Sequence, residues 1–172
     1  MKFNNKTIKF CYNVFKEEDF LKCNDYSHYI FTRGTYETNH SIWDESIIKD
    51  SHIVLIHKLN HKLPIFKMIS DVANEKLNIS PTGINFYAWT PGSYIPWHDD
   101  DHWKAGATIY LNNTWEKDWG GCFLYVDEND EIRGHYPERN TGVTQRGGIY
   151  HHVTRLGNNV PYRYTIQLYE NR

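Results

Sequence analysis

Two patterns of apolar residues follow each other along the chain, and the change falls near residue 80. Before that point, segments 16–27 and 63–79 combine good helix formers with apolar residues at three-to-four spacing, which is typical of amphipathic helices. Apolar, β-branched and aromatic runs near 8–15 and 52–59 indicate strands beside them. We therefore expect helices to fill this first part, together with a few strands.

After residue 80 the apolar runs are short, rich in β-branched and aromatic residues, and separated by PG, NN, GG and GNN turn signals. The runs are INFYAWT (84–90), GATIYLNN (106–113), GCFLYVDE (121–128), GVTQRGGIYHHVTRL (142–156) and YRYTIQLYE (162–170). They predict five or more strands of an antiparallel sandwich or barrel, so we expect a mainly β fold with flanking helices. The mouth of such a fold is a common place for a small-molecule site.

The length of 172 residues is typical of one domain, and it is enough to bury a normal core. We expect a single domain over 1–172, in which 1–80 form a helix-rich support layer and 81–172 form the core. The composition is 40% hydrophobic and 16% aromatic, far from that of disordered chains. The chain should therefore fold by itself.

Charge and hydropathy exclude several kinds of partner. The formal net charge is −2, so no overall positive field neutralises a phosphate backbone, and we expect no nucleic-acid partner. No run of about 18 apolar residues occurs, and the N-terminal residues lack the apolar stretch of a signal peptide. We expect a soluble, cytoplasmic protein without membrane contact, whose Cys11, Cys23 and Cys122 are reduced thiols.

The segment PWHDDDHW (96–103) carries the strongest chemical signal in the sequence, because it concentrates imidazole and carboxylate groups that bind divalent metals. In an extended segment alternate side chains share a face, so His98 and Asp100 would point the same way. The late segment YHHV offers a third ligand at His151 or His152. The structural alternative is a polar turn and two edge-strand histidines without a metal.

Two histidines and one carboxylate form the facial triad of non-haem Fe(II) oxygenases. Three protein ligands on one face leave about half of an octahedral shell open. A co-substrate can chelate the iron at these open positions, and O2 can bind beside it. The combination of residue types therefore favours an oxygenase over a structural metal site.

Residues 81–172 resemble the catalytic core of the prolyl 4-hydroxylase-like branch of the Fe(II)/2-oxoglutarate-dependent dioxygenases. Five blocks carry the resemblance in the family's order: YAWTPGSYIPWHDD, IYLNNTW, WGGCFLYVDE, PERNTGVTQRGGIYHHVTRL and YRYTIQLYE. In that family an Asn-bearing stretch lies eleven residues before the second histidine ligand, which matches Asn140 and His151. The resemblance implies a double-stranded β-helix (jelly-roll) core with N-terminal helices packed on one sheet, and the metal ligands His98, Asp100 and His151.

The resemblance also implies roles for residues around the metal. Arg163 matches the arginine that grips the far carboxylate of 2-oxoglutarate, and Tyr110 and Thr165 match hydroxyl groups that assist it. An arginine suits this task because its planar fork binds a carboxylate through two hydrogen bonds. Four aromatic residues are candidates for the wall of the substrate pocket: Tyr87, Tyr94, Trp97 and Trp103.

The implied activity is hydroxylation of a C–H bond with Fe(II), 2-oxoglutarate and O2, giving succinate and CO2 as co-products, with ascorbate as reductant. The resemblance favours a prolyl residue in a peptide or protein as substrate, and aromatic grooves suit proline. A free amino acid or other small molecule is the alternative, and a non-catalytic metal-binding jelly-roll protein is the alternative of another class. Nucleic-acid demethylases carry a second arginine where this chain has Tyr169, which argues against that branch.

Overall fold

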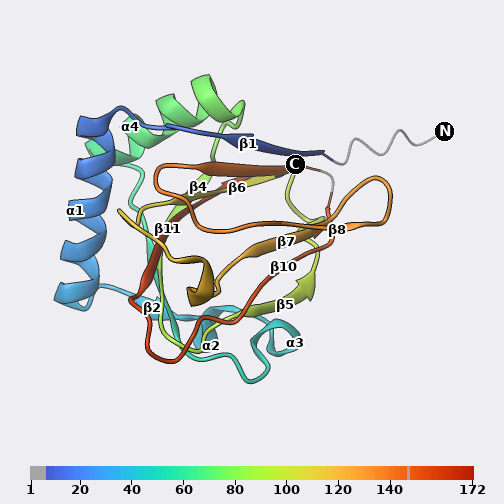
Figure 1. Cartoon of the computed structure of the whole chain (residues 1–172). Helices are drawn as coiled ribbons and strands as arrows, with labels where there is room; N and C mark the ends of the chain where they lie inside the picture. Colours follow the sequence, from blue (N-terminus) through green and yellow to red (C-terminus); the bar gives the residue numbers. More distant parts are fainter. Residues whose placement is uncertain (1–6, 147) are drawn as a thin grey trace.

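The computed structural model describes residues 7–146 and 148–172, and it contains two antiparallel sheets (Figure 1). Within these residues seven strands form the major sheet, in the order β1 (Thr7–Cys11), β9 (Gly142–Arg146), β6 (Ala105–Tyr110), β11 (Arg163–Glu170), β4 (Gly83–Trp89), β3 (Val54–Lys58) and β2 (Glu37–Thr38). The minor sheet has, in the same described part, β5 (Ile95–His98), β10 (His151–Val153), β7 (Phe123–Val126) and β8 (Ile132–His135). The mainly β fold with flanking helices is confirmed.

The helices come mainly from the first 80 residues, and the two longest overlap the segments where apolar residues recur at three-to-four spacing. They are α1 (Glu17–Arg33), α2 (Asn39–Ile42), α3 (Glu45–Ile48), α4 (Pro64–Val72), the π-helical turn η1 (Ala73–Leu77) and the 3-10 turn η2 (Lys117–Trp119). α1 ends at Gly34, which adopts the left-handed conformation that terminates many helices. No helix in the described residues combines the length and apolar character needed to cross a membrane.

The main core lies between the major sheet and the two longer helices. Phe20 and Ile30 of α1 and Ile69 of α4 share one buried cluster with Ile84 and Phe86 of β4. Because side chains alternate along a strand, the intervening residues of β4 face the opposite way, towards the minor sheet. Helices α1 and α4 therefore cover one face of the major sheet, and the other face is available for a site (Figure 1).

The strands of the first 80 residues belong to the same sheet as the later ones. β1 pairs with β9 along its whole length, and β3 pairs with β4 from Val54 to Lys58. These pairings extend the sheet on both sides of the central strands β6, β11 and β4. Residues 7–80 thus contribute sheet edges as well as helices.

Candidate metal centre

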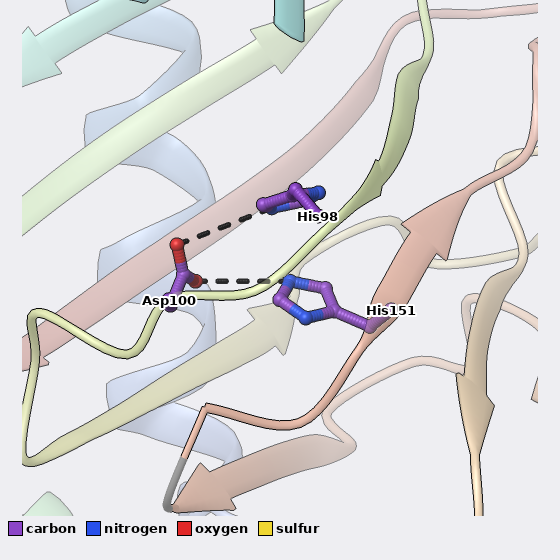
Figure 2. Close-up of side chains that lie close together, drawn as sticks. All are labelled: His98, Asp100 and His151. Atoms are coloured by element: carbon purple, nitrogen blue, oxygen red, sulfur yellow. Dashed lines mark ion pairs between the residues drawn. The ribbon is translucent and has the colours of Figure 1, made fainter.

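His98, Asp100 and His151 converge at one end of the minor sheet (Figure 2). His98 is the last residue of β5, and it lies directly opposite His151, the first residue of β10. Asp100 follows two residues after β5. Its Oδ1 lies 4.0 Å from His98 Nε2 and its Oδ2 3.7 Å from His151 Nε2, and one potential ligand atom from each residue lies within 4.8 Å of the others. The three candidate ligands from the sequence therefore meet in space.

Both imidazole rings are oriented by the same local hydrogen bond. Nδ1 of His98 lies 2.7 Å from the carbonyl oxygen of Pro96, and Nδ1 of His151 lies 2.7 Å from that of Ile149. A carbonyl oxygen only accepts, so each Nδ1 carries a proton, which leaves Nε2, on the Asp100 side, as the ring nitrogen available to a metal. Such outer hydrogen bonds fix the tautomer and direction of metal-binding histidines.

Burial keeps His151 in the form that binds metals. Its side chain is almost fully buried. This burial is the larger cause, and the charge of the nearby His98 the second, that lowers the pKa of His151 to about 4. At neutral pH the ring is therefore uncharged, as a metal ligand must be. Two imidazole nitrogens and one carboxylate oxygen form a donor set that fits Fe(II), so the residues present fit the metal that the resemblance implies.

A β-bulge in β5, and not simple alternation along the strand, determines which of its side chains face the metal centre. β5 ends at His98, so Asp100 lies beyond the strand rather than on it, contrary to the sequence prediction. His151 pairs with His98 and Val153 with Ile95, which gives three steps on β5 against two on β10. The extra residue resets the alternation, so that both Ile95 and His98 face the cavity described next.

A cavity of about 610 Å³ opens at the metal centre, between the inner face of the major sheet and the minor sheet. His98, Asp100 and His151 line one side of it. The opposite wall comes from β4, β6 and β11, and the segment around α2 and α3 closes one end with Trp43. The volume lies in the usual range of small-molecule sites.

The four aromatic candidates for the substrate pocket divide into two pairs. Tyr87 and Trp103 line the cavity. Tyr94 and Trp97 lie outside it, on the other face of the minor sheet, where the Trp97 ring stacks on His152 at 5.4 Å between centroids. The same bulge explains this outcome, because it turns Trp97 away from the side that His98 occupies. His152 accordingly faces away from the metal centre.

The three candidate residues for 2-oxoglutarate form a buried group beside the cavity. Arg163 is 1% exposed, and Thr165 lies directly opposite Tyr110 on the neighbouring strand. Burial lowers the pKa of Arg163 to about 10, which leaves the guanidinium charged at neutral pH. It donates to the carbonyl oxygen of Gly121 through Nη1, while Nε has no hydrogen-bond partner in residues 7–146 and 148–172.

Trp89 separates this buried group from the cavity. Its ring centroid lies 4.3 Å from the Arg163 guanidinium carbon, and its indole nitrogen donates to Thr165 Oγ1 at 3.3 Å. Trp89 itself lines the cavity, whereas Arg163, Thr165 and Tyr110 do not. The Trp89 ring therefore separates the charged guanidinium of Arg163 from the cavity that the candidate metal ligands line.

Three residues that the sequence reasoning did not place at the site are also there. Gln145 Nε2 donates to Asp100 Oδ2 at 2.8 Å. The Tyr169 hydroxyl lies 2.9 Å from that of Tyr87, and both residues line the cavity, as does Trp43. Because every second residue of a strand shares a face, counting along β11 from Arg163 would have placed Tyr169 on the same face. No feature of the sequence distinguishes Gln145 or Trp43.

No protein-family model and no curated protein matches the sequence, but solved structures share its fold over nearly the whole chain. A prolyl-4-hydroxylase from Pseudomonas putida has a TM-score of 0.74 at 15% identity, covering 98% of this chain and 94% of the other. A prolyl hydroxylase from Trichoplax adhaerens, in complex with a hypoxia inducible factor oxygen degradation domain peptide fragment, has a TM-score of 0.75 at 14% identity, covering 98% and 84%.

An oxidoreductase of the 2OG-Fe(II) oxygenase family from Burkholderia pseudomallei has a TM-score of 0.69 at 12% identity, covering 97% of this chain and 88% of the other. At these identities the likeness establishes the fold. The chain therefore has the jelly-roll fold of prolyl hydroxylases and 2-oxoglutarate/Fe(II) oxygenases, as the sequence predicts.

Proposed function

We propose that this protein is an Fe(II)- and 2-oxoglutarate-dependent dioxygenase that hydroxylates a C–H bond. The observation that carries the proposal is the convergence of His98, Asp100 and His151 at the edge of a 610 Å³ cavity. Two histidines and one carboxylate on a single face suit Fe(II) oxygenases. The shared fold with proteins of that chemistry supports the same conclusion.

Bound Fe(II), with 2-oxoglutarate as the reducing co-substrate, supplies the activation of O2, and succinate and CO2 are the co-products. The task of the protein is to bind and orient the reacting groups and to exclude water from them. His98 and His151 would hold the ion through Nε2, and Asp100 would balance part of its charge. Apolar Ile95 and Phe123, which line the cavity near these ligands, restrict water there.

Arg163, Thr165 and Tyr110 are the candidate receptor for the far carboxylate of 2-oxoglutarate. A buried guanidinium whose one hydrogen-bond acceptor in the described residues is a backbone carbonyl gains a charge-assisted pair when a carboxylate binds. The Trp89 ring covers this receptor. Binding of the co-substrate therefore requires the ring to rotate away from the guanidinium, which makes Trp89 a residue whose fluorescence should report the event.

A prolyl residue in a peptide or protein is the substrate that the cavity supports best. Asn85, Gln167 and Thr108 form one cross-strand row on the cavity wall, and Thr108 donates to Gln167 at 2.8 Å. Their uncharged donors and acceptors match the amide groups of a peptide backbone. Tyr87 and Trp103 supply flat walls of the kind that bind proline rings.

A free amino acid or other small molecule is the alternative substrate, and one observation favours it. Lys58 lies at the end of the same row and lines the cavity, where its ammonium group could bind a carboxylate. That ammonium already pairs with Glu37 at 2.9 Å. We therefore rank the peptide above the small molecule.

The experiment is anaerobic reconstitution with Fe(II), addition of 2-oxoglutarate, and then exposure to O2 with a panel of proline-containing peptides and free amino acids. We expect a visible charge-transfer band from the chelate, followed by succinate, with ascorbate sustaining the yield. Asp100→Ala should abolish both signals. Tight Fe(II) binding without chelation of 2-oxoglutarate, and without succinate from any panel member, would instead indicate a non-catalytic metal-binding protein.

A further inference from the structure

Gln145 makes the one side-chain hydrogen bond that the Asp100 carboxylate accepts within the described residues. Its Nε2 donates to Asp100 Oδ2 at 2.8 Å, from a strand of the other sheet. An ionised carboxylate only accepts hydrogen bonds, so the nitrogen of the amide, and not its oxygen, must face Asp100. The orientation of the Gln145 side chain is therefore fixed by chemistry.

The backbone opposite Gln145 leaves room for this contact. Gly106 is the direct cross-strand partner of Gln145. A Cβ at position 106 would lie 3.3 Å from Gln145 Nε2 and 3.6 Å from its Cγ. The first of these distances is tighter than ordinary van der Waals contact, so an alanine there would displace the amide by a few tenths of an ångström. The absence of a side chain at Gly106 lets Gln145 cross its neighbour and reach Asp100.

We propose that Gln145 is a positioning residue that makes Asp100 bind the metal through a single carboxylate oxygen. The proposal rests on the metal site of the proposed function. Oδ2 is held by the Gln145 amide, while Oδ1 has no hydrogen-bond donor among the described residues and lies on the His98 side. A carboxylate that turns freely can instead bind through both oxygens, which would occupy one of the positions that a chelating co-substrate needs.

The test compares Gln145→Leu with the wild type, using Co(II) as the probe metal. Outer hydrogen bonds to metal ligands are typically worth 10- to 100-fold in metal affinity, so Co(II) should bind about 10- to 100-fold more weakly to the variant. The visible absorption spectrum of the bound Co(II) should also change, because it depends on coordination number and geometry. The affinity of the metal-loaded protein for 2-oxoglutarate should fall as well.

Two further variants separate positioning from a general loss of structure. Gly106→Ala keeps the glutamine but displaces its amide, so it should shift the Co(II) spectrum in the same direction as Gln145→Leu. Thr144 lies next to Gln145 on β9, but its side chain faces away, near the Lys9 carbonyl. Thr144→Val should therefore match the wild type in Co(II) affinity and spectrum. Thermal unfolding of each variant shows whether the fold is retained.

The outcomes distinguish this inference from the proposed function. A folded Gln145→Leu with wild-type Co(II) affinity and spectrum would overturn the positioning role. A wild type that binds Co(II) but does not bind 2-oxoglutarate would overturn the proposed function alone, because the Co(II) comparison still decides the role of Gln145. Weaker Co(II) binding with an altered spectrum in both Gln145→Leu and Gly106→Ala would support it.

Discussion

Among single residues, Arg163 has the environment that says most about a ligand, because its guanidinium is buried. Removing a charged group from water is unfavourable unless it is paired, and in residues 7–146 and 148–172 no carboxylate lies within ion-pair distance of Arg163. Its contacts are the Gly121 carbonyl, the Trp89 ring and the Tyr110 ring at 5.8 Å. These interactions fit a receptor that a carboxylate completes.

We therefore expect Arg163→Met to weaken the binding of 2-oxoglutarate while sparing the metal. Loss of one partner of a charge-assisted pair costs about 2 to 5 kcal/mol, and methionine keeps much of the buried volume. Isothermal titration of Co(II)-loaded protein with 2-oxoglutarate measures the effect, and titration with Co(II) alone is the control. An unchanged affinity for 2-oxoglutarate would show that the co-substrate binds elsewhere.

How far sequence reasoning reaches at this scale depends on how each residue is specified. His98 and Asp100 could be proposed as ligands because few arrangements of such groups serve any purpose other than metal binding, whereas the family resemblance was needed to prefer His151 over His152. Trp97 was misplaced because the bulge on β5 is decided by pairing with β10, fifty residues later. Gln145 was missed because a single amide becomes informative only once its neighbour in space is known.

Among the secondary-structure elements, the turn before β7 depends on glycine. Gly120 has φ +73° and ψ −153°, a backbone conformation that residues with a side chain rarely adopt. A Cβ there would lie 2.1 Å from the Arg155 carbonyl oxygen. Gly121, with φ +70°, lies against the Arg163 side chain. Gly120 thus lets the chain pass close to the Arg155–Leu156 backbone, and Gly121 lets it pass close to the buried arginine.

Gly120→Ala should reduce the free energy of unfolding by more than the strain of the backbone alone, which is about 1 to 3 kcal/mol. The clash with a backbone oxygen cannot be relieved by turning a side chain. Gly34→Ala is the matched control, because Gly34 also has a positive φ but has nothing within 4 Å of the added Cβ. Urea denaturation of both variants gives the difference. Equal losses would mean that the turn can shift.

The edge strand β8 carries a histidine that should make stability depend on pH. Burial lowers the pKa of His135 below its usual 6.5, and the charge of Glu138 raises it in part. The ring lies among Tyr12, Tyr110 and Tyr136. Because the folded state holds the proton less readily than the unfolded state, stability should decline as the pH falls below about 6.5.

His135→Phe should lessen this decline, since phenylalanine fits among aromatic rings and does not titrate. The measurement is the free energy of unfolding by urea between pH 7.5 and pH 5.5. The comparison is made relative to the value at pH 7.5, where the histidine is neutral in both states, so that any packing difference cancels. Identical slopes in the wild type and the variant would remove His135 as a cause.

Some secondary-structure elements could be predicted from the sequence and others could not, and the difference has a physical reason. Long amphipathic segments such as α1 and α4 have a period that their own residues define, so each overlaps a segment that the pattern indicates, although α1 continues past residue 27 to Arg33 and α4 ends at Val72. β8 has four mostly exposed residues and is held by pairing with β7, so its own sequence carries little signal. The pairing that brings β5 beside β10 is also invisible in either segment alone.

For the whole molecule, the metal site joins two strands that are distant in the sequence. His98 is the last residue of β5, Asp100 follows two residues after that strand, and His151 is the first residue of β10. Both strands belong to the smaller sheet, and β5 lies at its edge. An ion bound by all three side chains would tie this edge strand to its neighbour, and binding would be coupled to the folding of the whole chain.

This coupling predicts that Co(II) raises the melting temperature. A ligand that binds only the folded state at 100 times its dissociation constant adds about 2.7 kcal/mol, and for a chain of this size that corresponds to roughly 5 to 10 °C. The measurement is thermal unfolding by circular dichroism with and without Co(II). Asp100→Ala should lose most of the shift, because one ligand and its charge are gone.

Thr144→Val should retain the full shift, since its side chain lies on the far face of β9. The comparison matters because the chain has 10 histidines, and surface histidines can bind Co(II) without a defined site. Such binding would be similar in all three proteins and would also favour the unfolded chain, which lowers the melting temperature. A shift of equal size in Asp100→Ala and the wild type would therefore place the stabilising ion away from His98 and His151.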